Sequence, residues 1–254
     1  MTATLASDRL APPGPWTDRA ALFLDLDGVL AAIEPRPEDV GPEPWRSRLL
    51  QRLLQRLDGR LAIISGRTLA EVDRILDHAV PAVAAVHGLV RRRSDGSLVA
   101  SVASQGLAKV RRGLAAFAAG RSGLVLEDKE VAVALHYRLA PELGSQVRAE
   151  AERLAREHQL KLQLGHMVAE VRERGADKGA AVRAFMNEPP FAGGVPIFLG
   201  DDLTDEDGFA AALALSGLGI LVGPMRTTVA RRRLADVEAV RAWLQAGLPQ
   251  GRAP

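Results

Sequence analysis

The 254-residue sequence contains no cysteine, which excludes a disulfide framework and a zinc site built from thiolates. No apolar run approaches the ~18 residues that a membrane-spanning helix needs, so we expect no membrane contact. The first eight residues carry neither a basic segment nor a long apolar one, and we therefore expect no secretion signal. These absences favour a cytoplasmic protein.

Lysine is scarce, and nearly all of the positive charge is arginine. The 33 basic residues include only four lysines: Lys109, Lys129, Lys161 and Lys178. A lysine in such a chain weakly indicates a position where the planar guanidinium of arginine could not replace it. The 31 acidic residues leave a formal net charge of +2, which is too small for a general nucleic-acid binder.

The proportions that remain are those of a globular protein, with 47% hydrophobic and 25% charged residues. At ~150 residues per domain, this length gives between one and two domains. A chain of this size buries roughly 70–75% of its unfolded surface and needs no disulfide or metal to fold.

The first hundred residues alternate between predicted strands and helices. After a lead-in to Trp16 that we expect to be flexible, apolar runs and helical spacings define the elements. We expect a strand at 21–24, a helix at 45–57, a strand at 61–65, a helix at 68–76 and a strand at 81–86. This alternation predicts an open, mostly parallel α/β sheet.

The middle of the chain has a different rhythm, in which each helix is followed by a strand hairpin. The expected elements are a helix at 105–119, strands at 124–127 and 131–137, a helix at 141–158, and strands at 160–164 and 167–171 joined at Gly165-His166. The α/β rhythm returns with a helix at 178–186 and strands at 196–199 and 219–222. We therefore expect a core formed by residues 1–104 and 175–254, and an inserted α+β cap at 105–174.

Ligands of open α/β sheets collect beyond the carboxyl ends of the strands, and the first predicted strand ends in Asp25-Leu26-Asp27-Gly28. Two carboxylates at the end of an apolar strand carry a large desolvation cost unless a positive group lies between them. A hard cation such as Mg²⁺ would satisfy them through oxygen ligands. A helix cap or Asx turn is the alternative, which we would favour for one aspartate but not for the pair.

Two further clusters favour an anionic ligand. Ser65-Gly66-Arg67 combines a hydroxyl, accessible backbone N–H groups and a guanidinium, which suits a phosphate as well as an ordinary turn. Lys178 stands in the first turn of a predicted helix, where its charge opposes the helix dipole. That placement favours a functional charge over a simple helix start capped by Asp177.

The strongest cluster follows the predicted strand at 196–199. It holds five acidic residues within seven positions: Asp201, Asp202, Asp205, Glu206 and Asp207. Such acids repel one another unless metal or solvent neutralises them, and a solvated loop seldom follows so apolar a strand. Together the clusters supply the parts for phosphoryl transfer, in which catalysis is mainly positioning and charge neutralisation.

These motifs, in this order, resemble the haloacid-dehalogenase-like (HAD) superfamily and, within it, the trehalose-6-phosphate phosphatase family. The resemblance spans roughly Leu22 to Leu244. The motifs that carry it are Asp25–Leu30, Ser65-Gly66-Arg67, Val86-His87-Gly88, Leu126-Glu127-x-Lys129, Ala134–Arg138, Val168-x-Glu170-Val171, Lys178-Gly179 and Leu199–Glu206. It implies a HAD-like Rossmannoid core with an inserted cap.

The resemblance also implies catalytic roles. Asp25 would attack phosphorus and form an aspartyl-phosphate, and Asp27 would protonate the leaving sugar oxygen and then activate water. Ser65 and Lys178 would hold the phosphoryl oxygens. The product would be trehalose, released from trehalose 6-phosphate.

The implied ligand sets follow from the same motifs. Mg²⁺ would bind Asp25, the main-chain carbonyl of Asp27 and Asp201, with support from Asp202 and Asp205. The substrate side would comprise Arg67, His87, Gly88, Glu127, Lys129 and Glu170. Acids and a lysine suit a sugar, because its hydroxyls both donate and accept hydrogen bonds.

Three positions depart from the family pattern. Val29 replaces a common threonine, Val90 stands where a glutamate is frequent, and Arg172-Glu173 replaces a Lys-Pro pair near the hinge between cap and core. These changes leave the chemistry intact and bear on substrate affinity and cap closure.

The same residues are compatible with other functions. The nearest is a related HAD phosphatase for sucrose 6-phosphate or mannosyl-3-phosphoglycerate. A phosphoacceptor receiver module also uses acids and a lysine, but it is about half this length and has no cap. An inactive regulatory relative fits poorly, because every core motif residue is present. We favour a monomer.

Overall fold

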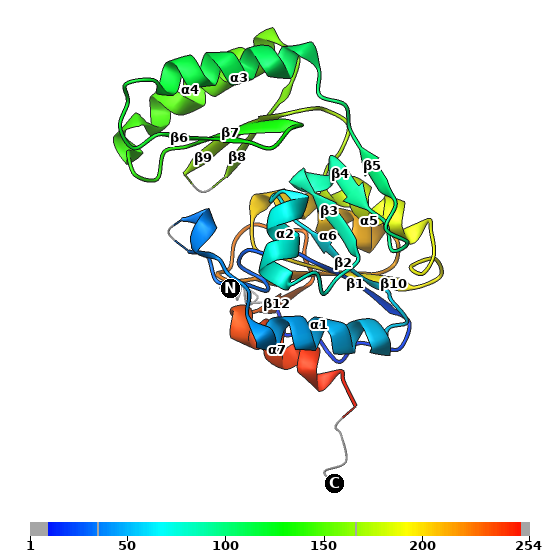
Figure 1. Ribbon diagram of the computed structural model, residues 1–254. Helices are drawn as coiled ribbons and strands as arrows, with labels where there is room; N and C mark the ends of the chain where they lie inside the picture. The colour runs from blue at the N-terminus through cyan, green and yellow to red at the C-terminus, as the bar shows by residue number, and fades with distance from the viewer. Residues whose placement is uncertain (1–9, 35, 166, 250–254) are drawn as a thin grey trace, which may run out of the picture.

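The computed structural model describes residues 10–34, 36–165 and 167–249 and contains two sheets, one above the other in Figure 1. The larger sheet has eight strands in the order β12-β11-β10-β1-β2-β3-β4-β5. Its strands are β1 Ala20–Leu24, β2 Leu61–Ile64, β3 Ala82–Ala85, β4 Val90–Arg92, β5 Leu98–Ala100, β10 Val195–Gly200, β11 Leu218–Val222 and β12 Arg232–Leu234. The neighbours from β12 to β3 pair parallel, and β4 and β5 add an antiparallel edge.

Helices cover both faces of this sheet because its strands are apolar on both sides. In β1, Leu22 and Leu24 belong to one apolar cluster, while Ala21 and Phe23 belong to another. The first cluster packs against α1 Pro44–Arg56, α2 Leu69–Leu76 and α7 Val237–Ala246. The second packs against α5 Lys178–Met186 and α6 Glu206–Ala214. The result is a three-layer α/β/α core.

The strand order reverses between β1 and β10. From β1 the chain proceeds outward through β2 and β3, whereas β10, β11 and β12 extend to the other side. Such a switch point opens a crevice at the carboxyl ends of the strands. The segments that follow β1, β2 and β10 therefore meet at one place.

The smaller sheet is antiparallel, in the order β6-β7-β9-β8, and we refer to residues 105–172 as the cap. Its strands are β6 Val125–Asp128, β7 Ala132–His136, β8 Lys161–Gly165 and β9 Val168–Arg172. Helices α3 Gln105–Ala118 and α4 Gly144–Glu157 cover the side away from the core, where the cap has its own apolar cluster (Figure 1). The uncovered side of the cap sheet faces the core.

The mostly parallel α/β core and the helix–hairpin order of the middle segment are confirmed. The sequence analysis did not predict α6, α7, the β4–β5 hairpin and β12, nor the short 3₁₀ turns at Pro37–Asp39, Val86–Gly88 and Leu203–Asp205. The helix expected from position 141 begins with a 3₁₀ turn at Pro141–Leu143. Of the expected hairpin joint Gly165-His166, position 166 lies outside the described residues, as do positions 1–9 of the expected lead-in. Within the described ranges, no helix combines the length and apolarity needed to traverse a bilayer.

The expectation of a flexible lead-in is wrong for the described part of it. Trp16 is buried against Gly247, where a Cβ atom would lie 1.9 Å from the indole ring. The indole N–H of Trp243 donates to the carbonyl of Gly14 at 2.8 Å, and the backbone N–H of Arg233 donates to Ala11. Ala11, Gly14 and Trp16 therefore anchor this segment to α7 and β12.

Candidate active site

The carboxyl ends of four neighbouring strands deliver the predicted polar residues to one edge of the core sheet. Asp25 follows β1, Ser65 follows β2, and Asp201 follows β10. His87 lies in the turn after β3, where Val86 and His87 both have positive φ values of 46° and 54°. Non-glycine residues in this region cost of order 1–3 kcal/mol each, and such strain is concentrated at functional sites.

Lys178 is the centre of the buried charges. Its Nζ atom donates to Asp25 Oδ2 at 2.8 Å and to Asp205 Oδ1 at 2.7 Å, and the side chain is only 2% exposed. Burial alone would lower the pKa of Lys178, but the two carboxylates outweigh it and raise that pKa. Asp177 starts the helix by accepting the N–H of Ala180, which fixes Lys178 in the first turn of α5.

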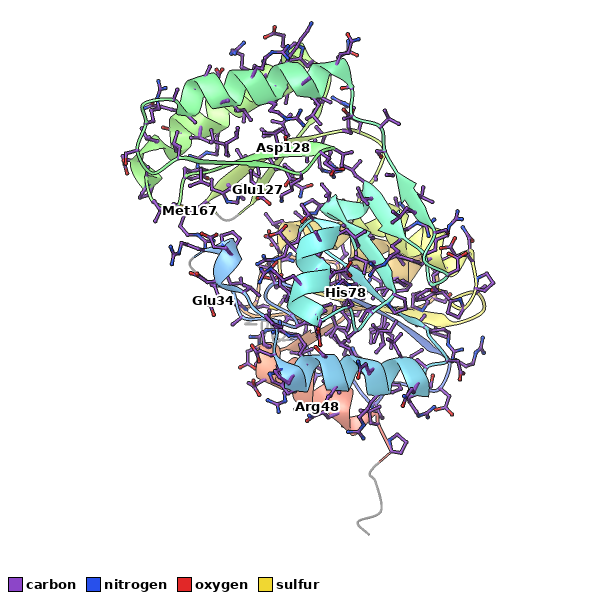
Figure 2. The ribbon with its side chains drawn as sticks, in the orientation of Figure 1. Glu34, Arg48, His78, Glu127, Asp128 and Met167 are labelled. Atoms are coloured by element: carbon purple, nitrogen blue, oxygen red, sulfur yellow. The ribbon has the colours of Figure 1, made fainter. Side chains whose placement is uncertain are left out.

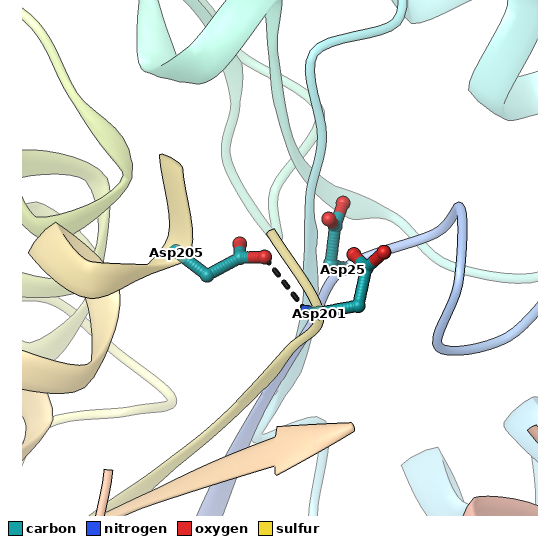
Figure 3. Close-up of side chains that lie close together, drawn as sticks. All are labelled: Asp25, Asp201 and Asp205. Atoms are coloured by element: carbon teal, nitrogen blue, oxygen red, sulfur yellow. Dashed lines mark hydrogen bonds between the residues drawn. The ribbon is translucent and has the colours of Figure 1, made fainter. Parts of the chain in front are cut away.

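Three carboxylates gather around this lysine. One oxygen each of Asp25, Asp201 and Asp205 lies within 4.8 Å of the others (Figure 3). Burial, followed by the repulsion of Asp205, raises the pKa of Asp201 to about 7, and burial also raises the pKa of Asp25 well above its usual value. Gly28 leaves room for the cluster, because a Cβ atom there would lie 2.3 Å from Asp201 Oδ2. A single lysine does not neutralise three carboxylates, so the donor set fits a hard divalent cation.

The acidic loop after β10 is held in shape by its own carboxylates. Asp205 is fully buried, and its Oδ2 atom accepts the backbone N–H groups of Asp201 and Asp202, each at 2.9 Å. The carboxylate of Asp202 accepts the N–H of Leu203 and so caps the short turn that follows. Of the predicted metal residues, the structure brings Asp25, Asp201 and Asp205 together, while the carboxylate of Asp202 points to its own turn.

Asp27 lies outside the carboxylate cluster because its side chain is paired with Arg67. Both carboxylate oxygens accept from the guanidinium, Oδ2 from Nε and Oδ1 from Nη2, at 2.7 Å each. Arg67 is also held by the carbonyl of Pro37 at 2.8 Å. This bidentate pair fixes the position of Asp27 two residues after Asp25.

A cavity of about 230 Å³ lies between these residues and the cap. The predicted site residues that line it are Asp25, Asp27, Ser65, Arg67, His87, Glu127, Lys129, Glu170, Lys178, Asp201 and Asp202. Gly88 does not line it. With φ at 95°, Gly88 instead packs against α5, where a Cβ atom would lie 3.0 Å from the carbonyl of Asp177.

The cap supplies the polar side chains opposite the catalytic edge. Lys129 Nζ donates to Glu170 Oε2 at 2.8 Å and to the carbonyl of Gly66 in the core at 3.0 Å. Burial would lower the pKa of Lys129, but Glu170 and Glu127 raise it, so the ammonium keeps its charge. Glu127 Oε2 lies 2.8 Å from His136 Nε2. Figure 2 shows Glu127 on the cap, above the core loop that carries Glu34.

The cavity also contains residues that the sequence analysis did not select. They include Glu34, Glu71, Gln163, Val168 and Thr204. Alternation along β8 and β9 is the signal for one of them, because Gln163 pairs in register with Glu170 and shares its face of the cap sheet. Val168 lies on the same face, at the start of β9. Glu71 belongs to α2, Thr204 to the turn Leu203–Asp205, and Glu34 to a loop, and the sequence pattern does not show that these three lie near the site.

Comparison with known proteins assigns most of the chain to one family. A family model described as trehalose-phosphatase matches residues 23–238. A trehalose-6-phosphate phosphatase of Escherichia coli K12 is 40% identical over 227 residues, which cover 89% of this chain and 85% of that protein. The solved C-terminal domain of a Candida albicans trehalose-6-phosphate phosphatase has a TM-score of 0.79 at 25% identity and covers 90% of this chain and 92% of that one.

The fold is shared more widely. A solved phosphatase of the haloalkanoate superfamily from Bacteroides thetaiotaomicron superposes with a TM-score of 0.59 at 16% identity, covering 95% of this chain and 96% of that one. At that identity the likeness concerns the fold alone. It confirms the predicted HAD-like architecture of a Rossmannoid core with an added cap.

The raised pKa of Asp201 predicts how the metal-free protein responds to pH. The folded state holds a proton on Asp201 up to pH about 7, whereas the unfolded chain releases it near pH 4, so this stability is lost as pH rises through about 7. In EDTA, the free energy of unfolding of the wild type relative to Asp201→Asn should therefore fall between about pH 4 and pH 7 and level off above that.

Urea denaturation at several pH values measures this difference. Mg²⁺ should then stabilise the wild type more than the variant, because the asparagine removes one charged ligand. Parallel pH profiles in EDTA would contradict the assigned electrostatics of the cluster.

Proposed function

This chain belongs to the trehalose-phosphatase family, and we propose that it hydrolyses trehalose 6-phosphate to trehalose and phosphate, a step of trehalose biosynthesis. The observation that carries the proposal is the single cavity that joins the two halves of the site. Asp25, Ser65 and Lys178 lie at its core side, and Glu127, Lys129 and Glu170 lie at its cap side. One end suits a phosphoryl group and the other suits sugar hydroxyls.

In the first step, a carboxylate oxygen of Asp25 attacks phosphorus, and the bond from phosphorus to the sugar oxygen breaks. Asp25 is aimed by two donors, since Oδ1 accepts the N–H of Leu26 at 2.7 Å and Oδ2 accepts from Lys178. Asp27 gives its proton to the departing sugar oxygen. Because Arg67 occupies both oxygens of Asp27 in this structure, substrate binding must loosen that pair, and Asp27 must take up a proton from solvent before it can act as the acid.

In the second step, Asp27 takes a proton from water, whose oxygen attacks the aspartyl-phosphate. The bond between Asp25 and phosphorus breaks, phosphate leaves, and both aspartates return to their starting forms. Ser65 and Lys178 hold the phosphoryl oxygens through both steps, as a hydroxyl donor and a positive charge respectively.

The metal of this proposal is Mg²⁺. Asp25, Asp201 and the main-chain carbonyl of Asp27 would hold it, while Asp202 and Asp205 shape the loop that presents Asp201. A bound Mg²⁺ would neutralise the negative charge that the cluster and the phosphoryl group bring together. The cytoplasmic location and the monomeric state that the sequence favours stay predictions.

Phosphate release from a panel of sugar phosphates tests the substrate. Trehalose 6-phosphate should give the highest kcat/KM, above sucrose 6-phosphate, mannosyl-3-phosphoglycerate and p-nitrophenyl phosphate, and EDTA should abolish turnover until Mg²⁺ is added back. Preference for another disaccharide phosphate would overturn the substrate assignment. Full activity in EDTA would overturn the metal.

Substitution of Glu170 tests the role of the cap. Glu170→Ala removes a buried carboxylate that orders Lys129, and the loss of one charge-assisted hydrogen bond corresponds to roughly 10- to 100-fold in kcat/KM for trehalose 6-phosphate. A small ester such as p-nitrophenyl phosphate does not reach the cap, so its kcat/KM should stay within a few-fold.

The matched control is Glu152→Ala, which removes an exposed carboxylate from the outer helix α4 of the same cap. Glu152→Ala should leave kcat/KM unchanged for both substrates. Equal losses on the two substrates in Glu170→Ala would mean that Glu170 maintains the structure instead of binding the sugar.

A further inference from the structure

A chain of three side chains crosses from the hinge of the cap to the core. Arg172, at the end of β9, donates from Nε to Gln163 Oε1 at 3.0 Å. Gln163 Nε2 in turn lies 2.7 Å from Nε2 of His87, which belongs to the core turn after β3. Arg172 is 1% exposed and also donates from Nη1 to the carbonyl of Ala176 at 2.6 Å, two residues before Lys178.

The direction of the Gln163 amide follows from its partners. A guanidinium has donors and no acceptor, so the atom of Gln163 that faces Arg172 must be the carbonyl oxygen. The amide NH₂ group therefore faces His87, and a donor needs a lone pair opposite it. His87 Nε2 must accept, which places the ring proton on Nδ1.

Local packing supports this arrangement of His87. Gly66 leaves the ring its space, since a Cβ atom there would lie 2.6 Å from His87 Nε2. Burial lowers the pKa of His87 well below its usual value, and Lys178 and Lys129 lower it further, so the ring is neutral. The competing acceptor for a proton on Nε2 is Glu170 Oε1, but it lies 3.6 Å away, farther than the amide of Gln163.

We propose that Arg172 and Gln163 are positioning residues that fix the tautomer of His87 and hold the cap in register over the core. Their joint effect leaves two groups without a partner among the described residues, the donor Nδ1 of His87 and the acceptor Oε1 of Glu170. Gln163, Glu170 and His87 line the cavity, whereas Arg172 does not line it and acts on the substrate only through them. The kinetic part of this proposal rests on the proposed function, whereas the tautomer does not.

Nitrogen NMR of protein labelled with ¹⁵N-histidine tests the tautomer without any substrate. The sequence has five histidines, and the loss of one signal set in His87→Asn assigns His87. The wild type should show the Nδ1-protonated neutral ring. Gln163→Glu places a carboxylate, which only accepts, against Nε2, so this nitrogen should become protonated.

The control for the spectrum is Arg156→Gln, an exposed position on α4 that should leave the His87 signals unchanged. An Nε2-protonated ring in the wild type, or the same spectrum in wild type and Gln163→Glu, would overturn the proposal. Because this measurement needs no turnover, it stands even if trehalose 6-phosphate is not the substrate.

Kinetics test the positioning role. Gln163→Ala and Arg172→Met should each raise KM for trehalose 6-phosphate about tenfold, the equivalent of one hydrogen bond, with kcat nearly unchanged. Arg172→Lys keeps a charged donor, so its KM should lie between those of the wild type and Arg172→Met. Parameters for p-nitrophenyl phosphate should not change.

Folding is checked separately, because Arg172 is fully buried. Thermal melting shows which variants are folded. If Arg172→Met does not fold, the milder Gln163→Ala still tests the positioning role. A fall in kcat by as large a factor as the rise in KM would contradict the positioning role. So would an equal fall in kcat/KM for trehalose 6-phosphate and p-nitrophenyl phosphate.

Discussion

The buried contact of Lys178 with Asp25 and Asp205 is the constraint on which the rest of the site depends. One ammonium group, almost fully buried, holds a strand end and the acidic loop together across the switch point of the sheet. Removal of either partner would leave a buried charge unpaired, and such breaks are strongly destabilising. Asp205 also positions the acidic loop, because its other oxygen accepts the backbone N–H groups of Asp201 and Asp202. The site is therefore a cluster of three carboxylates and one lysine whose excess negative charge fits a divalent cation.

The molecule separates chemistry from recognition. The core sheet brings the residues proposed for phosphoryl transfer to one edge through its parallel topology, and the cap has its own apolar cluster and turns its uncovered face to the core. Lys129 connects the two, since it contacts both Glu170 and the carbonyl of Gly66 beside Ser65. A substrate that fills the cavity must therefore satisfy both parts at once, which links binding of the sugar to alignment of the phosphate.

The sequence allows prediction of what depends on local pattern. Apolar strands that end in polar residues place Asp25, Ser65 and Asp201 at one edge, and the lysine at 178 stands out because arginine fills most other basic positions. Helix α6 is rich in small residues, so it lacks the periodic contrast that marks an amphipathic helix, and β12 is too short and basic to resemble a strand. The contact of Gln163 with His87 joins residues 76 positions apart, and only the folded chain shows it.

The central claim is that Asp25 is the nucleophile, and direct detection of its phosphorylated form tests this most directly. Enzyme quenched in acid during turnover of trehalose 6-phosphate should carry the mass of one phosphoryl group on the peptide that contains Asp25. The modification should increase in Asp27→Asn, in which hydrolysis of the intermediate lacks its base, and should be absent in Asp25→Asn, which should also be inactive. A phosphorylated peptide elsewhere, or turnover by Asp25→Asn, would contradict the account.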